Sequence, residues 1–199
     1  MWQLENEART QVYRKDETDE RFLMSFNSRL APGESELEPA ASGSAPPTFI
    51  IGAPRTGTTL LSQLVTALLD VGYINNLTAR FWEAPLQGIR LSRIVGLNRG
   101  PSRFTSEHGV SLDLDGPHEF GYFWANWLGS VPAPLPDPEV DWSGLSRSIQ
   151  AMSGAFAKPM VFKNLLVIHH LAGIARTFSR ALAVWCRRDP LDTCLSILE

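Results

Sequence analysis

The sequence predicts an α/β fold, a three-layer arrangement in which helices flank a central parallel sheet. Three short apolar runs of strand length predict the sheet, at residues 49–51, 160–162 and 181–186. Each run is followed by residues with a helical pattern, and a loop that contains glycine joins the first run to its helix. This succession of strand, glycine-bearing loop and helix is typical of the start of an α/β domain.

The composition is that of a globular protein large enough to bury a core. Of the 199 residues, 44% are hydrophobic and 20% are charged, and the net charge is −3. This charge argues against a broad surface for nucleic acid or for anionic membranes, although it is compatible with a local basic pocket. We therefore expect neither nucleic-acid nor membrane partners.

Cysteine usage and the first residues indicate the compartment. Cys186 and Cys194 lie in apolar stretches without the spacing of a redox pair, which favours a reduced, cytoplasmic protein. Residues 1–30 carry charges throughout and lack an unbroken apolar run, so they predict no signal peptide. No stretch of the sequence reaches the roughly 18 apolar residues that a membrane helix needs.

The chain divides into three predicted parts. Residues 1–30 place apolar side chains at helical spacing among many charges and predict a helical appendage. Residues 31–47 are rich in proline, glycine, serine and glutamate and predict a linker. Residues 48–199 are then the α/β domain.

Within this domain, apolar periodicity predicts helices at 58–69, 86–94, 165–178 and 191–198. Residues 71–157 are harder to divide, because this stretch is dense in tryptophan, proline and glycine. Its aromatic segment, residues 120–127, could line an apolar acceptor pocket, but it is preferably interpreted as a helix that packs on the sheet. A long irregular stretch inside a compact domain usually indicates a binding region.

The loop after the first apolar run reads G-A-P-R-T-G-T-T from Gly52 to Thr59. Two glycines followed by Thr-Thr have the spacing of a P-loop, in which backbone N–H groups surround an anion at a helix N-terminus. A nucleoside-triphosphate enzyme needs a lysine directly after the second glycine, for the β- and γ-phosphates. Here that position is Thr58, and the positive charge lies inside the loop at Arg55.

A second cluster follows the last apolar run, with the sequence R-R-D-P at 187–190 and then Ser196. Ser196 lies eight residues beyond Arg188, just over two helical turns, so it faces roughly the same way as the helix start. An arginine and a hydroxyl placed in this way can share one phosphate. A surface Arg–Asp pair and a solvated serine would explain the same residues.

Together, APRTGTT at 53–59 and RRDP…S at 187–196 resemble the motifs of the sulfotransferases that use 3′-phosphoadenosine 5′-phosphosulfate, PAPS. In that family such a loop holds the 5′-phosphosulfate, and the later arginine and serine hold the 3′-phosphate. The resemblance covers roughly residues 48 to 199 and is greatest with the bacterial-type branch, which has arginine in the loop. It implies a P-loop-type three-layer fold, PAPS as co-substrate and no metal.

The resemblance also implies a role for each matching residue. The implied ligands of the 5′-phosphate are the residues that end the loop: Thr56, Gly57, Thr58 and Thr59. Arg188 and Ser196 would bind the 3′-phosphate. Lys163 ends the run PMVFK, where the family has a lysine close to the transferring sulfuryl group. Arg55 and Lys163 would neutralise the charge that grows on the leaving phosphate.

An acceptor hydroxyl needs a general base. Glu83 in ARFWEAP is the first candidate, because relatives with arginine in the loop often use a glutamate in this region. A structural salt bridge would explain Glu83 equally well. His118 and Glu119 in GPHEFGYFW are the second candidates, and His108 is the third.

Two other functions are compatible with parts of this pattern. A P-loop nucleotide kinase or phosphotransferase would share the loop, but Thr58 stands where it needs lysine. A non-catalytic nucleotide-binding module would share the fold, but it need not keep Arg55, Lys163, Arg188 and Ser196. The acceptor stays open among carbohydrates, small alcohols or phenols and tyrosyl peptides, and self-association into a homo-oligomer also stays open.

The sequence ends at Glu199, inside the last predicted helix. Leu195, Ile197 and Leu198 keep this helix apolar to its end, with no stop signal after them. Relatives in the resembled family usually continue through further helices, another strand and a basic loop. We therefore expect the chain to be a C-terminally truncated fragment.

Overall fold

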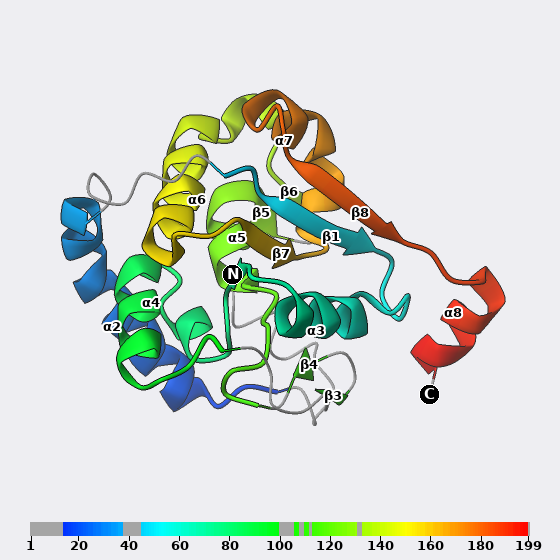
Figure 1. Cartoon of the computed structure of the whole chain (residues 1–199), viewed down its shortest axis with the longest axis horizontal. Helices are drawn as coiled ribbons and strands as arrows, with labels where there is room; N and C mark the ends of the chain where they lie inside the picture. Colours follow the sequence, from blue (N-terminus) through cyan, green and yellow to red (C-terminus); the bar gives the residue numbers. More distant parts are fainter. Residues whose placement is uncertain are drawn as a thin grey trace.

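The computed structural model describes residues 14–37, 45–99, 106–107, 110–111, 113–130 and 133–198. Its centre is a four-stranded sheet in the order β2-β7-β1-β8, with every pair parallel. The strands are β1 (Thr48–Gly52), β2 (Gly72–Tyr73), β7 (Met160–Lys163) and β8 (Leu182–Cys186). Helices pack on the sheet from both sides (Figure 1), which confirms the predicted α/β fold with a flanked parallel sheet.

Residues 49–51 of strand β1 are apolar and buried, as expected for a strand that lies inside the sheet and is covered on both faces. Phe49 and Ile50 are each 1% exposed and point to opposite faces, since side chains alternate along a strand. The Phe49 ring lies 6.0 Å from the Trp124 ring and 5.9 Å from the Phe162 ring. Helix α3 (Thr58–Leu68), which follows β1, packs on the sheet against β1 and β7.

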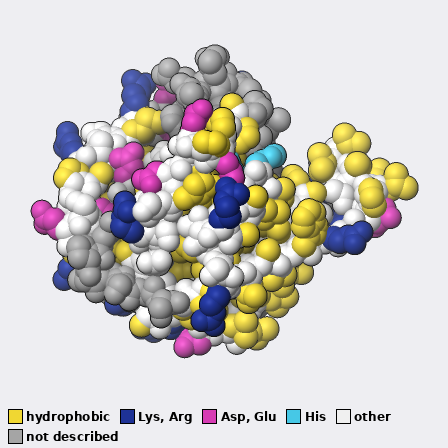
Figure 2. All heavy atoms as spheres, turned by 90° about the horizontal axis from the view of Figure 1, so that it is seen from above, with side chains coloured by type: hydrophobic (Ala, Val, Ile, Leu, Met, Phe, Trp, Pro, Cys, Tyr) yellow, Lys and Arg dark blue, Asp and Glu magenta, His cyan; other side chains and the backbone are white. Residues whose placement is uncertain are grey.

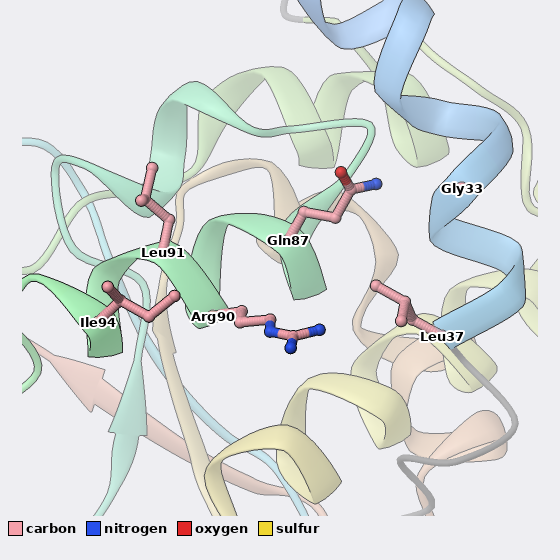
Figure 3. Close-up of a pocket in the computed structure, with 6 residues that line it drawn as sticks. All are labelled: Gly33, Leu37, Gln87, Arg90, Leu91 and Ile94. Atoms are coloured by element: carbon pink, nitrogen blue, oxygen red, sulfur yellow. The ribbon is translucent and has the colours of Figure 1, made fainter.

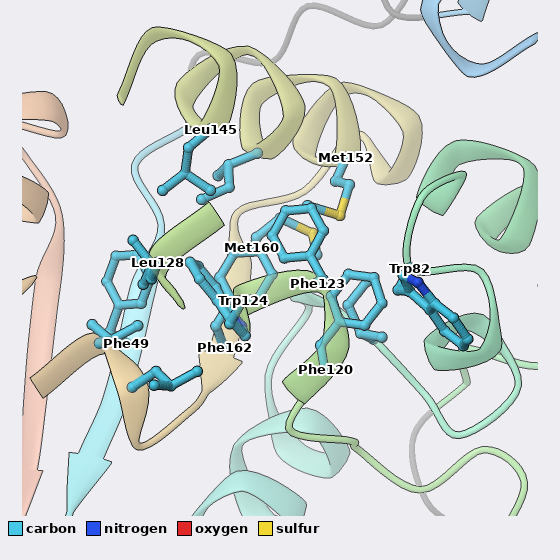
Figure 4. Packing of buried hydrophobic residues seen from close by; sticks show 14 of the residues in the cluster. Phe49, Trp82, Phe120, Phe123, Trp124, Leu128, Leu145, Met152, Met160 and Phe162 are labelled. Carbon is cyan, nitrogen blue, oxygen red and sulfur yellow. The ribbon is translucent and has the colours of Figure 1, made fainter. Parts of the chain in front are cut away.

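The largest part of the core lies between the sheet and three helices, α5 (Gly121–Leu128), α6 (Trp142–Phe156) and α7 (Leu171–Thr177). Figure 4 shows its aromatic centre, where Trp124 is fully buried and meets Phe162 edge to face at 5.3 Å. The rings of Phe120 and Phe123 stack at 4.6 Å. The aromatic segment 120–127 is therefore a core helix, as the sequence predicts.

The remaining short helices and strands lie between β2 and β7 or after β7. They are η3 (Thr78–Arg80), α4 (Pro85–Ile94), β3 (Ser106–Glu107), β4 (Val110–Ser111), β5 (Gly129–Ser130), β6 (Ala133–Pro134), η4 (Asp137–Glu139), η5 (Leu166–His170) and α8 (Pro190–Leu198). The helix predicted at 165–178 is divided into η5 and α7. Helix α6 has no counterpart among the predicted helices; Asp141 caps it by accepting the Gly144 N–H at 2.8 Å.

Helix α2 (Glu17–Leu37) crosses the boundary expected at residue 30 between appendage and linker. Tertiary contacts hold this helix beyond that point, because the Glu34 carboxylate accepts the Leu86 N–H at 2.6 Å and so caps α4. The first thirteen residues and residues 38–44 of the expected linker lie outside the described residues. The division into appendage, linker and domain stays a prediction.

The side of the molecule formed by β8, α8 and the outer face of α3 is apolar and exposed. Trp185 on β8 is 58% exposed, and Leu195 and Leu198 on α8 are 60% and 84% exposed. Figure 2 shows hydrophobic side chains gathered along this side and over the projecting α8. Among the described helices, none is both long and apolar enough to cross a membrane.

Candidate functional site: the anion-binding loop

The loop between β1 and α3 needs a glycine at its first position because the chain closes tightly there. A Cβ on Gly52 would lie 2.6 Å from Thr56 Oγ1 and 2.8 Å from the carbonyl oxygen of Cys186 on β8. Thr56 closes the turn by donating its hydroxyl to the Ala53 carbonyl at 2.7 Å. The loop is therefore folded back on the ends of two strands.

Gly57 ends the loop in the left-handed conformation, at φ 90°, and is the N-cap of α3. Thr58 and Thr59 follow in the first turn of the helix. The first turn of a helix presents N–H groups without intrahelical partners, and the helix dipole makes this end positive. The loop and the start of α3 thus form the kind of site that binds phosphate or sulfate groups.

Arg55 connects the loop to α8. Its Nε donates to Ser196 Oγ and to the Ser196 carbonyl, both at 3.0 Å. Arg55 has φ 65°, which is an unfavourable conformation for a residue with a side chain. Arg188 Nη1 donates to the Arg55 carbonyl at 3.2 Å, a contact that favours this conformation. Arg55, Arg188 and Ser196, which lie far apart in the sequence, therefore meet at the loop.

Lys163 reaches the same loop from the end of β7. Its ammonium group lies 2.7 Å from Thr59 Oγ1 and 2.6 Å from Glu119 Oε1. The lysine side chain is only 6% exposed, whereas the Glu119 side chain is 42% exposed. This buried charge is thus paired with a carboxylate, as a buried charge must be.

Parallel pairing explains why these groups converge. Strands β7, β1 and β8 are neighbours and run in the same direction, so their C-terminal ends lie along one edge of the sheet. Lys163 ends β7, Arg55 follows β1 and Arg188 follows β8. Each of three adjacent strands therefore supplies one cation to the edge where ligands of open α/β sheets usually bind.

The candidate bases lie in different surroundings. Glu83 is exposed, and its backbone N–H donates to Asn27 Oδ1 on α2 at 3.0 Å. His118 is partly buried, and its Nδ1 accepts the Phe120 N–H at 2.8 Å. Burial, followed by the nearby positive charges, lowers the pKa of His118 to about 4. His108 lies outside the described residues.

The sequence analysis overlooked Asn164, which follows Lys163 directly. Its Nδ2 donates to the Glu119 carbonyl at 3.0 Å, and its Oδ1 accepts the Leu166 N–H at 2.7 Å. Asn164 is 4% exposed and therefore holds the Glu119 backbone beside the end of β7. The signal for it was a pair of polar residues directly after a buried strand.

A second concave region lies away from this loop, between α2 and α4 (Figure 3). It has a volume of about 360 Å³ and is lined by Gly33, Leu37, Gln87, Arg90, Leu91 and Ile94. None of the site residues predicted from the sequence lines it. Within the described ranges, no group of three or more His, Cys, Asp or Glu side chains is placed to hold a metal ion.

Comparison with known proteins identifies the family and the fold. Residues 46–198 match the family model described as the sulfotransferase family. The fold is similar to the crystal structure of sulfotransferase STF9 from Mycobacterium avium, with TM-score 0.52 and 15% identity over 86% of this chain and 49% of that one. Sulfotransferase STF1 from Mycobacterium tuberculosis H37Rv gives TM-score 0.49 and 18% identity over 90% of this chain and 56% of that one. The chain thus spans about half the length of these solved structures, and no curated protein matches the sequence.

Proposed function

Because the chain belongs to the sulfotransferase family, we propose that it serves to transfer a sulfuryl group from PAPS to an acceptor hydroxyl. The observation that carries this proposal is the convergence of Arg55, Lys163 and Arg188 at one loop. A donor with a phosphosulfate at one end and a 3′-phosphate at the other requires positive charge spread over such an edge.

The two ends of the donor would be held by different strands. The N–H groups and hydroxyls of residues 56–59 would surround the 5′-phosphate at the start of α3. Arg188 and Ser196, at the β8 side, would hold the 3′-phosphate. Arg55 and Ser196 are hydrogen-bonded to each other, so a bound phosphate would replace the neutral serine hydroxyl by a charged acceptor for the Arg55 guanidinium.

Sulfuryl transfer, like phosphoryl transfer, places growing negative charge on the leaving phosphate. Lys163, at the end of β7, and Arg55, within the loop after β1, would neutralise it together. Both charges are already held by hydrogen bonds, so little reorganisation is needed during the reaction. The arginine at position 55 favours the bacterial-type branch over the lysine-bearing one.

Small-molecule and carbohydrate acceptors are both compatible with this site. The acceptor would approach from the side of Glu119, whose side chain is the exposed partner of the Lys163 ion pair. The aromatic side chains of α5 that lie in the core are not available to it, since Phe123 and Trp124 are 2% and 0% exposed.

Ligand-induced stabilisation tests the donor class. A ligand at 100 times its Kd adds about 2.7 kcal/mol to stability, which raises the Tm of a chain of this size by roughly 5–11 °C. We expect this shift with 3′,5′-ADP, the product of PAPS, and none with ATP and Mg²⁺. The reverse pattern would favour a nucleotide kinase and reject the proposal. Labelled sulfate transfer to a panel of alcohols, phenols, sugars and tyrosyl peptides separates an enzyme from a binding module.

Arg188→Ala tests the proposed 3′-phosphate site, and Arg187→Ala is its matched control at the neighbouring position. Loss of a charge-assisted hydrogen bond should weaken 3′,5′-ADP binding by about 10- to 100-fold. Binding of 5′-AMP, which lacks the 3′-phosphate, should weaken far less. If both nucleotides weaken equally in isothermal titration, Arg188 does not recognise the 3′-phosphate.

A further inference from the structure

The carboxylate of Glu119 is the acidic group that the structure places beside the proposed reaction centre. Its Oε1 lies 2.6 Å from Lys163 Nζ, which in turn lies 2.7 Å from Thr59 Oγ1. Glu119 is thus within two hydrogen-bond lengths of the proposed phosphate-binding hydroxyl. Because its side chain is 42% exposed, an acceptor can reach it from solvent.

The backbone around Glu119 is held on both sides. Asn164 Nδ2 donates to the Glu119 carbonyl, and Asn164 is itself fixed by the Leu166 N–H. The next residue, Phe120, is 1% exposed and precedes α5 directly. A general base must stay within hydrogen-bond reach of the proton it removes, and a backbone held in this way would keep the carboxylate in one place.

The neighbouring histidine cannot act as the base in this geometry. His118 Nδ1 accepts the Phe120 N–H, so in the neutral ring the proton is on Nε2. The one basic nitrogen is therefore already occupied. The lowered pKa of His118 agrees with a neutral, structural ring.

Glu83 is held by a different part of the molecule. Its N–H donates to Asn27 Oδ1, and Asn27 is fully buried and donates in turn to the carbonyls of Leu23 and Arg80. These contacts fix the Glu83 backbone to α2 and η3. The contact with Lys163, at the end of β7, belongs instead to Glu119.

We propose that Glu119 is the general base that removes the proton from the acceptor hydroxyl. This inference rests on the proposed sulfotransferase function. The acceptor oxygen forms a bond to the sulfur of PAPS while the bond from sulfur to the bridging phosphate oxygen breaks. The electron pair of that bond leaves with 3′,5′-ADP, and the acceptor proton passes to the Glu119 carboxylate and later to water.

The ion pair gives this proton transfer a second effect. While Glu119 is ionised, it compensates the charge of Lys163 at 2.6 Å. Once Glu119 has taken the proton, it is neutral, and the Lys163 charge acts fully on the leaving phosphate. Proton removal on the acceptor side is thereby coupled to charge stabilisation on the donor side.

Glu119→Gln tests the inference, with Glu139→Gln, an exposed carboxylate on η4, as the matched control. Turnover of the best acceptor of the wild type should fall by about 10²-fold or more in Glu119→Gln, because general-base catalysis contributes an effect of this size. The thermal shift with 3′,5′-ADP should stay as in the wild type. Turnover of the control should not change.

Turnover of Glu119→Gln, measured with a series of acceptors whose hydroxyl groups increase in acidity, distinguishes a general base from a residue that only positions Lys163. Without its base the enzyme depends on acceptors that ionise by themselves, so the loss should shrink as acidity increases. An equal loss across the series, retained turnover, a lost 3′,5′-ADP shift, or a larger loss in Glu83→Gln would each overturn the inference. A wild type that neither binds 3′,5′-ADP nor transfers sulfate rejects the proposed function instead.

Discussion

Replacing Gly52 by alanine should disturb the strand edge and the loop at the same time. The added Cβ would lie 2.6 Å from Thr56 Oγ1, 2.8 Å from the Cys186 carbonyl and 3.1 Å from Thr58 Cγ2. The threonine side chains can rotate away, but the carbonyl is backbone in the register partner of Gly52 on β8. Relief therefore requires β1 and β8 to separate at their ends.

The size of the effect follows from two opposing contributions. Inserting a methyl group into a closely packed site typically costs about 1–3 kcal/mol. Replacing glycine by alanine at an unstrained site also stabilises the fold by roughly 0.4–1 kcal/mol, because it reduces the conformational entropy of the unfolded chain. The net loss should be about 1–2 kcal/mol, which corresponds to a Tm lowered by roughly 2–8 °C. Binding of 3′,5′-ADP should weaken as well, because Arg188 follows the displaced end of β8.

Gly121→Ala is the matched control, because a Cβ at Gly121, the first residue of α5, meets no atom within 4 Å. Differential scanning calorimetry should show a lowered Tm for Gly52→Ala and an unchanged or raised Tm for Gly121→Ala. Titration should show a weaker affinity for 3′,5′-ADP in Gly52→Ala than in Gly121→Ala. Equal melting temperatures and equal affinities would refute the argument that the close approach of β1 and β8 requires glycine.

Three further predictions concern stability and association. Burial lowers the pKa of His118 from 6.5 to about 4, so the unfolded chain binds the proton first and stability should fall as pH decreases between these values. Urea unfolding at neutral pH and at about pH 5 should show this loss in the wild type but not in His118→Asn; the same loss in both would contradict it. Glu34→Ala should lower the free energy of unfolding by about 1–3 kcal/mol, because it leaves the buried Leu86 N–H without its carboxylate; a change within error in chemical denaturation would show that solvent replaces this cap. The exposed apolar side should cause this 199-residue chain to self-associate. Light scattering should show a smaller mass for the double variant Leu195→Glu, Leu198→Glu, and a wild type that stays monomeric with rising concentration would contradict the expectation.

Much of the fold could be predicted because local pattern and tertiary structure agree there. Strands β1, β7 and β8 are short apolar runs, and the loop after β1 has a spacing that only a helix N-terminus explains well. The position of Ser196 followed from helical geometry, and the structure brings its hydroxyl to Arg55 and its helix to the loop. The strands, the loop and the helical placement of Ser196 depend on residues close together in the sequence, whereas the contact of Ser196 with Arg55 depends on the fold.

The parts that escaped prediction depend on distant contacts. Strand β2 has two residues, too few for a periodic signal, and is defined by its pairing with β7. The Glu119–Lys163 pair forms because α5 packs on the sheet beside β7, which no local pattern reports. Helix α2 likewise extends past the expected boundary because Glu34 caps a helix far along the chain. Tertiary packing determines these features.

The residues proposed to bind the donor and the residue proposed to meet the acceptor lie in different parts of the chain. The cations and hydroxyls proposed for the donor lie on β1, α3, β7, β8 and α8, whereas residues 74–159 form one continuous insertion between β2 and β7. Glu119, the proposed base, belongs to this insertion, and its ion pair with Lys163 joins the insertion to the cations proposed for the donor. Substitutions within the insertion can therefore change which hydroxyl is recognised while the phosphate-binding edge keeps its register. We expect that exchanging residues 74–159 between relatives of this fold transfers acceptor preference and leaves affinity for the nucleotide unchanged.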